Sequence, residues 1–248
     1  MRAPLRGGKA STLVMGQFGN AFAVGATSLY WSTTGGGVMT MPLAGRAFTT
    51  LVSTTNECPH PPNPPNECTY PPAMAADATH LYWSNAGQSA TLMRVLLDGG
   101  APTTLASAQD SPGALALDAT SLYWVDWGWS DVIPPSWQGY GPNAGSVIKA
   151  PLSGGAQMTL VSGVSPCGLA VDAASAYWTD FPESFPNGRI MKVPLTGGTP
   201  TTVVSSEGEP MACPIAVDAT SLYWGTVGVS SRVGVITFTG ALMKTTPK

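Results

Sequence analysis

Short apolar runs separated by turn residues recur along the chain. Each recurrence opens with an apolar run and a small turn, as in Leu115-Ala116-Leu117 before Asp-Ala-Thr-Ser, and continues with a run that contains a Tyr-Trp pair. After a variable stretch come a third run ending in Pro-Leu, a Gly-Gly turn and a Thr-rich fourth run such as Thr201–Val204. Short apolar runs bounded by Gly, Pro and Asp predict strands. Each unit is therefore predicted to be a four-stranded antiparallel meander.

The Tyr-Trp pairs measure the period of this repeat. They lie 41 to 54 residues apart, at Tyr30-Trp31, Tyr82-Trp83, Tyr123-Trp124, Tyr177-Trp178 and Tyr223-Trp224. Spacings of this size are typical of propellers and solenoids. A single four-stranded sheet exposes both faces, and packing sheets around an axis buries them. We therefore predict an all-β fold in which residues 1–248 form one β-propeller domain.

The number of blades depends on how the two ends of the chain are used. Residues 1–14 resemble residues 93–106, and the chain ends inside a unit at residues 241–244. If residues 241–244 are the third strand of the last unit, Ser11–Val14 can supply the fourth strand and close a five-bladed ring. If Val235–Phe238 is the third strand instead, a sixth, incomplete blade results. We favour five blades, and we expect the chain to be a fragment with sequence upstream.

The repeated residues themselves have structural explanations. An Asp that opens a tight turn accepts backbone N–H bonds, which accounts for four copies at Asp77, Asp118, Asp172 and Asp218. The Tyr-Trp rings are expected to pack within and between blades. Proline cannot donate a ladder hydrogen bond, so we expect the third strands to end or bulge at Pro4, Pro42, Pro151 and Pro194.

The fourth unit resembles a known repeat. Tyr177-Trp178-Thr179-Asp180, followed by Gly188-Arg189-Ile190 and preceded by Ala170-Val171-Asp172, resembles the YWTD repeat, the class B repeat of the LDL-receptor family. That resemblance implies a propeller, six-bladed in the receptor family. The fuller phrases DATSLYW and KVPLTGG look closer to secreted or lipid-anchored bacterial propellers of unassigned function. Only Asp126 and Asp180 match the family's fourth-position Asp, which helps to lock its blades, so more of the bracing here should come from aromatic packing.

The connections between the runs divide into a uniform set and a variable set. In propellers, the turns joining strands 1 to 2 and 3 to 4 share one face, and the remaining connections share the other. The first set is short here, whereas the second holds every insertion, at residues 53–72, 125–145, 180–188, 205–213 and 225–234. Loops on a rigid scaffold commonly carry recognition, so we look for function on the variable face.

The aromatic-rich insertion at 125–145 is the strongest candidate for a binding site. It contains every Trp outside the repeat phrase, and residues 181–185 of the next unit can extend it. Flat amphipathic rings beside carboxylates suit sugar stacking or a protein hot spot. The alternative is a loop that packs on its own aromatic residues. The candidate ligand-binding residues are Asp126, Trp127, Trp129, Asp131, Trp137, Tyr140, Phe181 and Phe185.

Two cysteine pairs indicate an oxidising compartment. Cys58 and Cys68 enclose a Pro-rich stretch that cannot pair into a sheet, so we expect a disulfide, with metal binding through Cys58, His60 and Cys68 as the alternative. Cys167 and Cys213 each lie five residues before the repeat Asp, at the start of equivalent strands. They can approach disulfide distance, although buried free thiols remain the alternative. We expect a secreted, periplasmic or cell-envelope protein.

Composition and missing motifs narrow the functional classes. Charged residues make up 10% of the chain and the net charge is −3, which argues against nucleic-acid binding. No apolar run is long enough for a membrane helix, and the first residues do not form a signal peptide. With two His residues and neither a GxSxG motif nor a P-loop, a catalytic triad is not expected.

We therefore predict a non-catalytic recognition module that binds protein or glycan through its variable face, without a cofactor or bound metal. The alternative is a metal-dependent hydrolase or lyase of the gluconolactonase type. Its site would lie at the channel mouth, near Glu57, Glu67, Glu207 and Glu209.

Overall fold

The computed structural model confirms an all-β chain in which five antiparallel sheets, one for each Tyr-Trp pair, are the blades of a β-propeller. It describes residues 12–13, 21–33, 36–45, 47–53, 73–85, 90–128, 143–181, 188–205, 211–232 and 235–248. These residues contain no helix, and so no helix able to cross a membrane. The chain divides into two compact units, residues 1–107 and 108–248.

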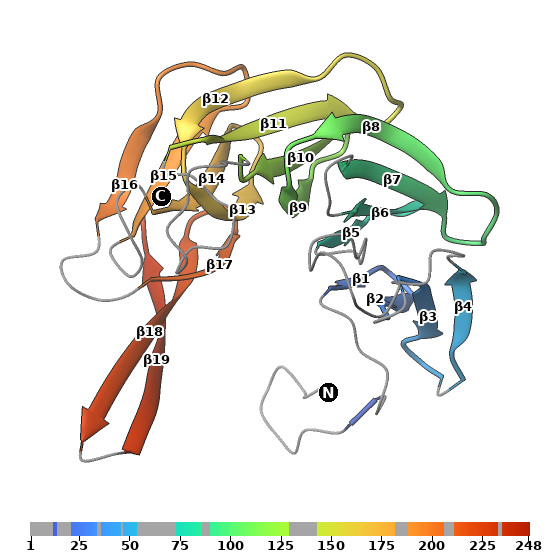
Figure 1. Cartoon of the computed structure of the whole chain (residues 1–248), viewed down its shortest axis with the longest axis horizontal. Helices are drawn as coiled ribbons and strands as arrows, with labels where there is room; N and C mark the ends of the chain where they lie inside the picture. The colour runs from blue at the N-terminus through green and yellow to red at the C-terminus, as the bar shows by residue number, and fades with distance from the viewer. Residues whose placement is uncertain are drawn as a thin grey trace, which may run out of the picture. The chain divides into compact units, whose positions relative to one another are not determined.

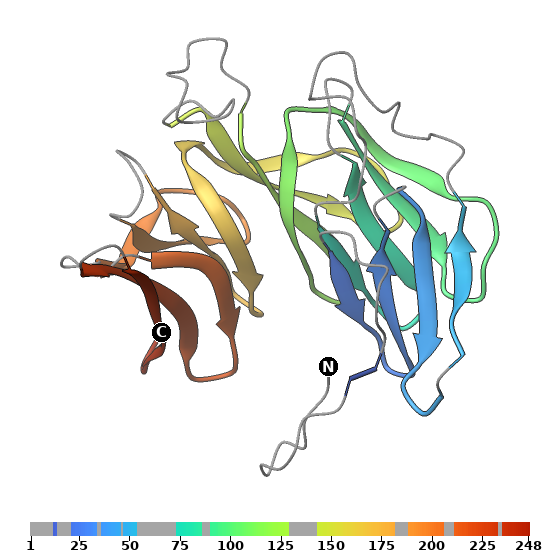
Figure 2. The same cartoon turned by 60° about the horizontal axis from the view of Figure 1, so that its bottom comes forward.

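The first unit contains two four-stranded meanders (Figures 1 and 2). One consists of β1 (Phe22–Val24), β2 (Ser28–Ser32), β3 (Val38–Pro42) and β4 (Thr49–Val52). The other consists of β5 (Met74–Ala76), β6 (His80–Asn85), β7 (Ala90–Leu96) and β8 (Thr103–Gln109), the last of which runs across the boundary between the units.

The second unit contains two more four-stranded meanders and one three-stranded sheet. The third sheet comprises β9 (Pro112–Leu117), β10 (Ser121–Asp126), β11 (Gly145–Pro151) and β12 (Met158–Val164). The fourth comprises β13 (Pro166–Val171), β14 (Ser175–Asp180), β15 (Arg189–Pro194) and β16 (Thr201–Ser205). The fifth comprises β17 (Met211–Val217), β18 (Leu222–Arg232) and β19 (Val235–Thr245).

The fifth sheet corrects the six-blade alternative. Residues 235–238 and 241–244 belong to the same strand, β19, which pairs with β18 from Arg232↔Val235 to Leu222↔Thr245. Residues 241–244 therefore lie in the third strand, and a separate fourth strand there is wrong. The predicted fourth strand at Ser11–Val14 falls largely outside the described residues.

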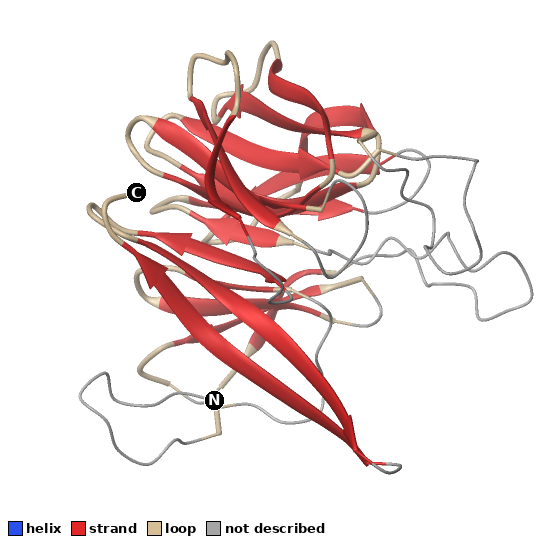
Figure 3. Cartoon of the chain, turned by 90° about the vertical axis from the view of Figure 1, so that its left-hand side faces the viewer, coloured by secondary structure: helices blue, strands red, loops and turns tan. Residues whose placement is uncertain are grey.

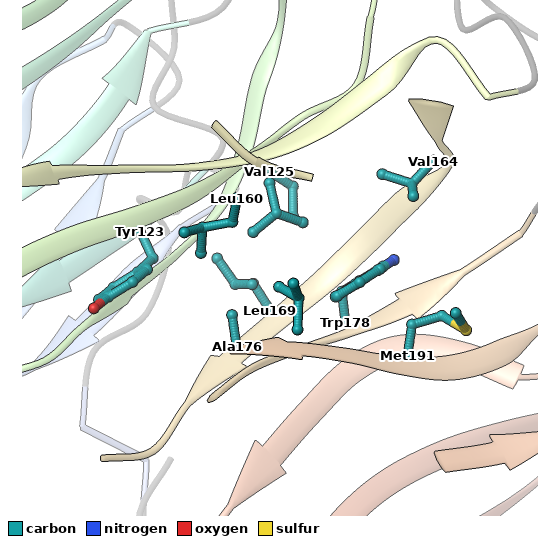
Figure 4. Close-up of a cluster of buried hydrophobic side chains, with 10 residues drawn as sticks. Tyr123, Val125, Leu160, Val164, Leu169, Ala176, Trp178 and Met191 are labelled. Atoms are coloured by element: carbon teal, nitrogen blue, oxygen red, sulfur yellow. The ribbon is translucent and has the colours of Figure 1, made fainter. Parts of the chain in front are cut away.

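Within each of the two units, the Tyr-Trp pairs contribute to the buried layers between successive sheets, as expected. Side chains on neighbouring strand positions point to opposite faces of a sheet, so the two rings of a pair enter different layers. Tyr123 of the third sheet and Trp178 of the fourth share one buried cluster (Figure 4), and Tyr177 and Trp224 share the next. In the first unit Tyr30 and Trp83 share another. Within each unit, a Tyr of one blade and a Trp of the next therefore pack in the same layer.

The predicted strand ends are also confirmed where the structure describes them. Pro42, Pro151 and Pro194 are the last residues of β3, β11 and β15. A proline at that point ends the ladder without leaving an unpaired donor. Pro4 lies outside the described residues.

Each repeat Asp holds the turn between the first two strands of its sheet. In the third sheet, Asp118 Oδ1 accepts the backbone N–H groups of Thr120 at 2.7 Å and Ser121 at 2.8 Å. Its other oxygen accepts the hydroxyl of Tyr123 at 2.6 Å. The same three bonds recur at Asp77, Asp172 and Asp218. The carboxylate thus ties the turn to the aromatic layer, a tyrosine bond that the sequence pattern did not reveal.

These bonds predict how the stability of the protein depends on acid. Burial raises the pKa of Asp172, but hydrogen bonds from Lys248, Ala174, Ser175 and Tyr177 outweigh it and lower the pKa to about 2. Because the folded carboxyl binds its proton more weakly than the unfolded one, its contribution is complete above the ordinary value of 3.8 and is lost as pH falls toward 2.

The free energy of unfolding of the parent protein should therefore fall between pH 4 and pH 2. In Asp172→Asn it should fall less over the same range. Urea unfolding followed by tryptophan fluorescence across that range measures the effect. Equal slopes for the variant and the parent protein would contradict the assignment.

Candidate functional site

One end of each described four-stranded sheet is uniform. Besides the Asp turns, a backbone bond joins the turn after the third strand to the turn after the first. Leu97 N–H donates to the Thr79 carbonyl at 2.9 Å and Leu152 N–H to that of Thr120 at 2.8 Å. Leu43 and Leu195 make the equivalent bonds to Thr27 and Ala174. This repeated bonding leaves little structural difference between modules at this end.

The other end carries the connections that differ in length. These connections span fewer residues than the predicted insertions. Within the predicted insertions, residues 125–126 and 145 lie in β10 and β11, residue 180 in β14, and residues 205 and 211–213 in β16 and β17. The stretches at 54–72, 129–142, 182–187 and 206–210 lie outside the described residues. The predicted loop at 225–234 is wrong, because residues 225–232 continue β18.

The fifth sheet is extended at this variable end by a long hairpin. Strands β18 and β19 have 11 residues each, whereas the second and third strands of the other sheets have 5 to 7. The ladder is continuous from Val227↔Gly240 to Arg232↔Val235, beyond the part of the sheet that contains Tyr223 and Trp224 (Figure 3). The last module thus places a paired ribbon where another module has a loop.

Trp127 lies at the start of the aromatic insertion and is anchored to the scaffold. Its N–H donates to the Ser111 carbonyl at 3.2 Å, and its partly buried ring packs against the cluster that contains Tyr123 and Trp178. A Cβ atom at Gly113 would overlap the indole ring. Of the other candidates in this loop, Asp126 is described, whereas Trp129, Asp131, Trp137 and Tyr140 lie outside the described residues.

Phe181 occupies the equivalent place in the fourth module. Its N–H donates to the Ser165 carbonyl at 3.0 Å, and its ring packs against the cluster of Tyr177 and Trp224. A Cβ atom at Gly188 would overlap the Phe181 ring. Phe185 lies outside the described residues. The two described aromatic candidates therefore hold the bases of their loops against the core.

Asp126 and Asp180 have the same position but different surroundings. Asp180 is completely buried; it accepts the Ser165 N–H and forms an ion pair with Arg189 at 2.8 Å. The Asp126 side chain is also buried, and its Oδ2 accepts the Asp110 N–H at 3.0 Å. Burial raises the pKa of Asp126, with the nearby negative charge of Asp110 acting in the same direction. Asp180 thus has a hydrogen bond and an ion pair within its own module, whereas Asp126 has no cationic partner among the bonds that the structure shows.

Of the two alternatives left open for Cys167 and Cys213, the structure shows the disulfide. Cys167 in β13 and Cys213 in β17 are bonded, with their Cα atoms 5.2 Å apart, so the bridge joins the first strands of the fourth and fifth sheets. Such a bond is characteristic of proteins from oxidising compartments. Cys58 and Cys68 lie outside the described residues, as does His60, their alternative metal partner.

The enzymatic alternative depends on residues that the structure does not describe. Glu57, Glu67, Glu207 and Glu209 all lie outside the described ranges. Within those ranges, no three His, Cys, Asp or Glu side chains gather in a way that could hold a metal ion.

Comparisons with known proteins identify the fold but no family. No model of a known protein family matches the chain, so the YWTD family stays a resemblance, and no curated protein matches it either. Solved propellers do match. A protein assigned as TolB from Agrobacterium tumefaciens has a TM-score of 0.62 at 10% identity, covering 92% of this chain and 76% of its own. A gluconolactonase from Xanthomonas campestris has a TM-score of 0.57 at 19% identity, covering 85% and 72%.

A third similar structure is the oligogalacturonate lyase of Vibrio parahaemolyticus. Its TM-score is 0.53 at 10% identity; the match covers 80% of this chain and 55% of the lyase, so this chain spans about half of that protein. All three identities are too low to transfer an activity, and fold alone does not determine function. The likenesses are compatible with both a binding module and an enzyme.

Proposed function

We propose that the chain is a non-catalytic recognition module whose variable end, and above all the aromatic insertion after β10, binds a protein or glycan partner outside the cytoplasm. The observation that carries the proposal is the contrast between the two ends of the sheets. One end repeats the same hydrogen bonds from module to module, whereas the other differs in loop length and carries the long hairpin. Variable loops on a constant scaffold are the usual arrangement of binding proteins.

The anchoring of the loop bases supports this proposal. A loop that starts from a fixed backbone has fewer conformations to lose on binding, which favours affinity. Trp127 and Phe181 fix two neighbouring loops in this way, through main-chain bonds to Ser111 and Ser165 and through packing on buried clusters. We accordingly assign Trp127 and Phe181 to positioning, and contact with the partner to Trp129, Trp137 and Tyr140.

The composition of the aromatic insertion favours contacts through ring faces. Residues 129–142 contain two Trp, one Tyr and one Asp, with no Lys or Arg. Large rigid rings contribute much contact area at low entropic cost, and aromatic residues dominate binding hot spots. The Cys167–Cys213 bridge supports the extracytoplasmic location.

The test is removal of the loop without damage to the sheet. The backbones of Gly128 and Ala144 adjoin, since a Cβ atom on Gly128 would overlap Ala144, so a Gly-Gly linker can replace residues 129–142 between them. The parent protein and this variant would be probed with a defined glycan array and a displayed peptide library. We expect binding by the parent protein and at least a tenfold loss, about 1.4 kcal/mol, in the variant.

Two controls make the result interpretable. The variant should keep the thermal midpoint of the parent protein, which shows that the sheets are intact. A second variant, with the hairpin shortened by joining Val227 to Gly240 through a two-residue turn, should keep the binding if the aromatic insertion is the site. Equal binding by the parent protein and the loop-deleted variant would reject the site, and binding to neither library would reject the recognition proposal.

A further inference from the structure

The ammonium group of Lys248 lies in a site that two neighbouring modules form at the end of the sheets with the Asp turns. Its Nζ forms an ion pair with Asp172 Oδ2 of the fourth module and donates to the Asp218 carbonyl of the fifth at 2.6 Å. The same nitrogen lies 5.9 Å from the centre of the Tyr177 ring, within the range of a cation–π contact. A carboxylate, a carbonyl and a ring face thus hold one lysine side chain, which is only 14% exposed.

The parts of this site recur one module earlier, between the third and fourth modules. Asp118 accepts the same two backbone bonds in its turn as Asp172 does. Tyr123 donates its hydroxyl to Asp118 Oδ2 at 2.6 Å, as Tyr177 does to its own Asp at 3.0 Å. The carbonyl comes from Asp172, whose turn closes like that of Asp218, with the Asp N–H donating to the serine carbonyl three residues later at 3.0 Å. The third–fourth junction therefore carries the same three groups.

The fourth module has no lysine at the position of Lys248. Lys248 comes four residues after the cross-strand partner of Tyr223, and the residue four after the cross-strand partner of Tyr177 is Thr196. Threonine carries no charge, and among the described residues no cation forms an ion pair with Asp118. The third–fourth junction thus has the carboxylate without a lysine of its own.

Asp118 is able to hold a cation that comes from solvent. Burial raises the pKa of its carboxyl, but hydrogen bonds from Tyr123 and from the turn outweigh burial and lower the pKa below 3.8, so the group is ionised at neutral pH. The residue is partly exposed. Lys149, which pairs with Tyr123 across the ladder, donates its Nζ–H to the Leu195 carbonyl at 2.6 Å rather than to Asp118.

We infer that the third–fourth junction binds a lysine side chain of a partner protein. The ammonium group contacts the Asp118 carboxylate, the Asp172 carbonyl and the Tyr123 ring, as Lys248 contacts their counterparts one module later. A primary ammonium group has three N–H donors for the two oxygens, and its apolar stem can lie along a ring. The site is at the opposite end of the sheets from the aromatic insertion, so it is separate from the proposed recognition surface.

The probe is Nα-acetyl-lysine methylamide, titrated into the ¹⁵N-labelled full chain at constant ionic strength and followed in ¹H–¹⁵N correlation spectra. The amides of Thr120 and Ser121, which donate to Asp118, should shift with half-saturation on the order of 10 mM, as expected for a single partly exposed ion pair. Asp118→Asn should raise that concentration at least tenfold. Asp98→Asn, which removes an exposed carboxylate from the turn after β7, should leave it unchanged.

The Lys248 site provides an internal control. In the parent protein the amides of Ala174 and Ser175, which donate to Asp172, should not respond to the probe, because Lys248 already fills that junction. In Lys248→Ala the same amides should shift with the probe. The Nε-acetylated form of the probe, which has no charge, should shift neither pair of amides.

These outcomes do not depend on the binding libraries, whose variants change the other end of the sheets. Shifts of Thr120 and Ser121 that are lost in Asp118→Asn, with shifts of Ala174 and Ser175 only in Lys248→Ala, would support the site. The inference would be overturned by unshifted Thr120 and Ser121 amides in the parent protein, or by an Asp118→Asn variant that responds like the parent. Equal shifts with the uncharged probe, or Ala174 and Ser175 amides that stay unshifted in Lys248→Ala, would overturn it too.

Discussion

Replacing Ile190 by alanine is expected to lower the free energy of unfolding by about 2–5 kcal/mol, whereas the same truncation at Leu242 should change it by less than about 0.5 kcal/mol. The two residues occupy equivalent positions on third strands. Ile190 pairs with Thr179 one residue after the Trp178↔Met191 pair, and Leu242 pairs with Gly225 one residue after Trp224↔Met243. A sequence alignment alone would assign both the same cost.

The expected effects differ because Ile190 is buried and Leu242 is exposed. The residues in this register on the first four sheets, Val38, Leu92, Val147 and Ile190, are all 0% exposed, but Leu242 is 80% exposed. Ile190 contacts the cluster that contains Tyr177 and Trp224 of the following layer. Truncating it removes apolar contacts and leaves a cavity. In the described residues Leu242 has no such layer over it, so truncation removes little buried area.

Urea unfolding monitored by tryptophan fluorescence would measure both variants. Leu92→Ala in the second sheet is the matched control and should resemble Ile190→Ala. A loss of 2 kcal/mol or more for Leu242→Ala would contradict the expectation and show that the outer face of the fifth sheet is covered in solution.

The repeat made most of the architecture predictable. Each Tyr-Trp pair marks a strand, and the residues around it recur closely enough to place the strand order of all five sheets. The sheet containing Tyr177 shows why this worked: Asp172 forms the turn, Pro194 ends the third strand, and both rings enter buried layers. Local turn chemistry and side-chain alternation act over a few residues, so a single sequence can reveal them.

The errors lie where a segment departs from the repeat. Comparison with the other modules predicts a loop at residues 225–234, yet residues 225–232 continue the ladder because β18 and β19 pair along their whole length. The charge on Asp126 could not be evaluated either. Its difference from Asp180 depends on which residue faces it across the ladder, Ser146 or Arg189, and an insertion of unlike length in each module obscures that register.

The repeat could not identify the ligand, for the same reason. Four of the eight predicted binding residues lie between 129 and 142, and that stretch has no counterpart elsewhere in the chain from which its structure could be inferred. The sequence does carry a signal that Trp127 and Phe181 belong to the framework. Both directly follow a fourth-position Asp, and each packs against a glycine whose missing side chain leaves room for the ring: Trp127 against Gly113 and Phe181 against Gly188.

Loss of the Cys167–Cys213 bond should lower the free energy of unfolding by about 4 kcal/mol. The cysteines are 46 residues apart in sequence, and closing a loop of that size removes much of the conformational entropy of the unfolded chain. The native backbone already brings the two strands together. Gly168 has no room for a Cβ atom beside the Cys213 carbonyl, and the Thr179 hydroxyl donates to that carbonyl at 3.1 Å while accepting the Gly168 N–H at 2.9 Å.

The test compares urea midpoints of the parent protein and Cys167→Ala/Cys213→Ala under non-reducing conditions. Cys58→Ala/Cys68→Ala is the matched control, because it removes the other cysteine pair and leaves this bridge in place. Adding a reductant should lower the urea midpoint of that control, and the loss of stability should equal the loss that the Cys167 and Cys213 substitutions cause in the parent protein. A variant with all four cysteines replaced by alanine should keep the same urea midpoint with and without the reductant. An oxidised parent protein no more stable than Cys167→Ala/Cys213→Ala would show that the strands are held together by Thr179 and the aromatic layer alone.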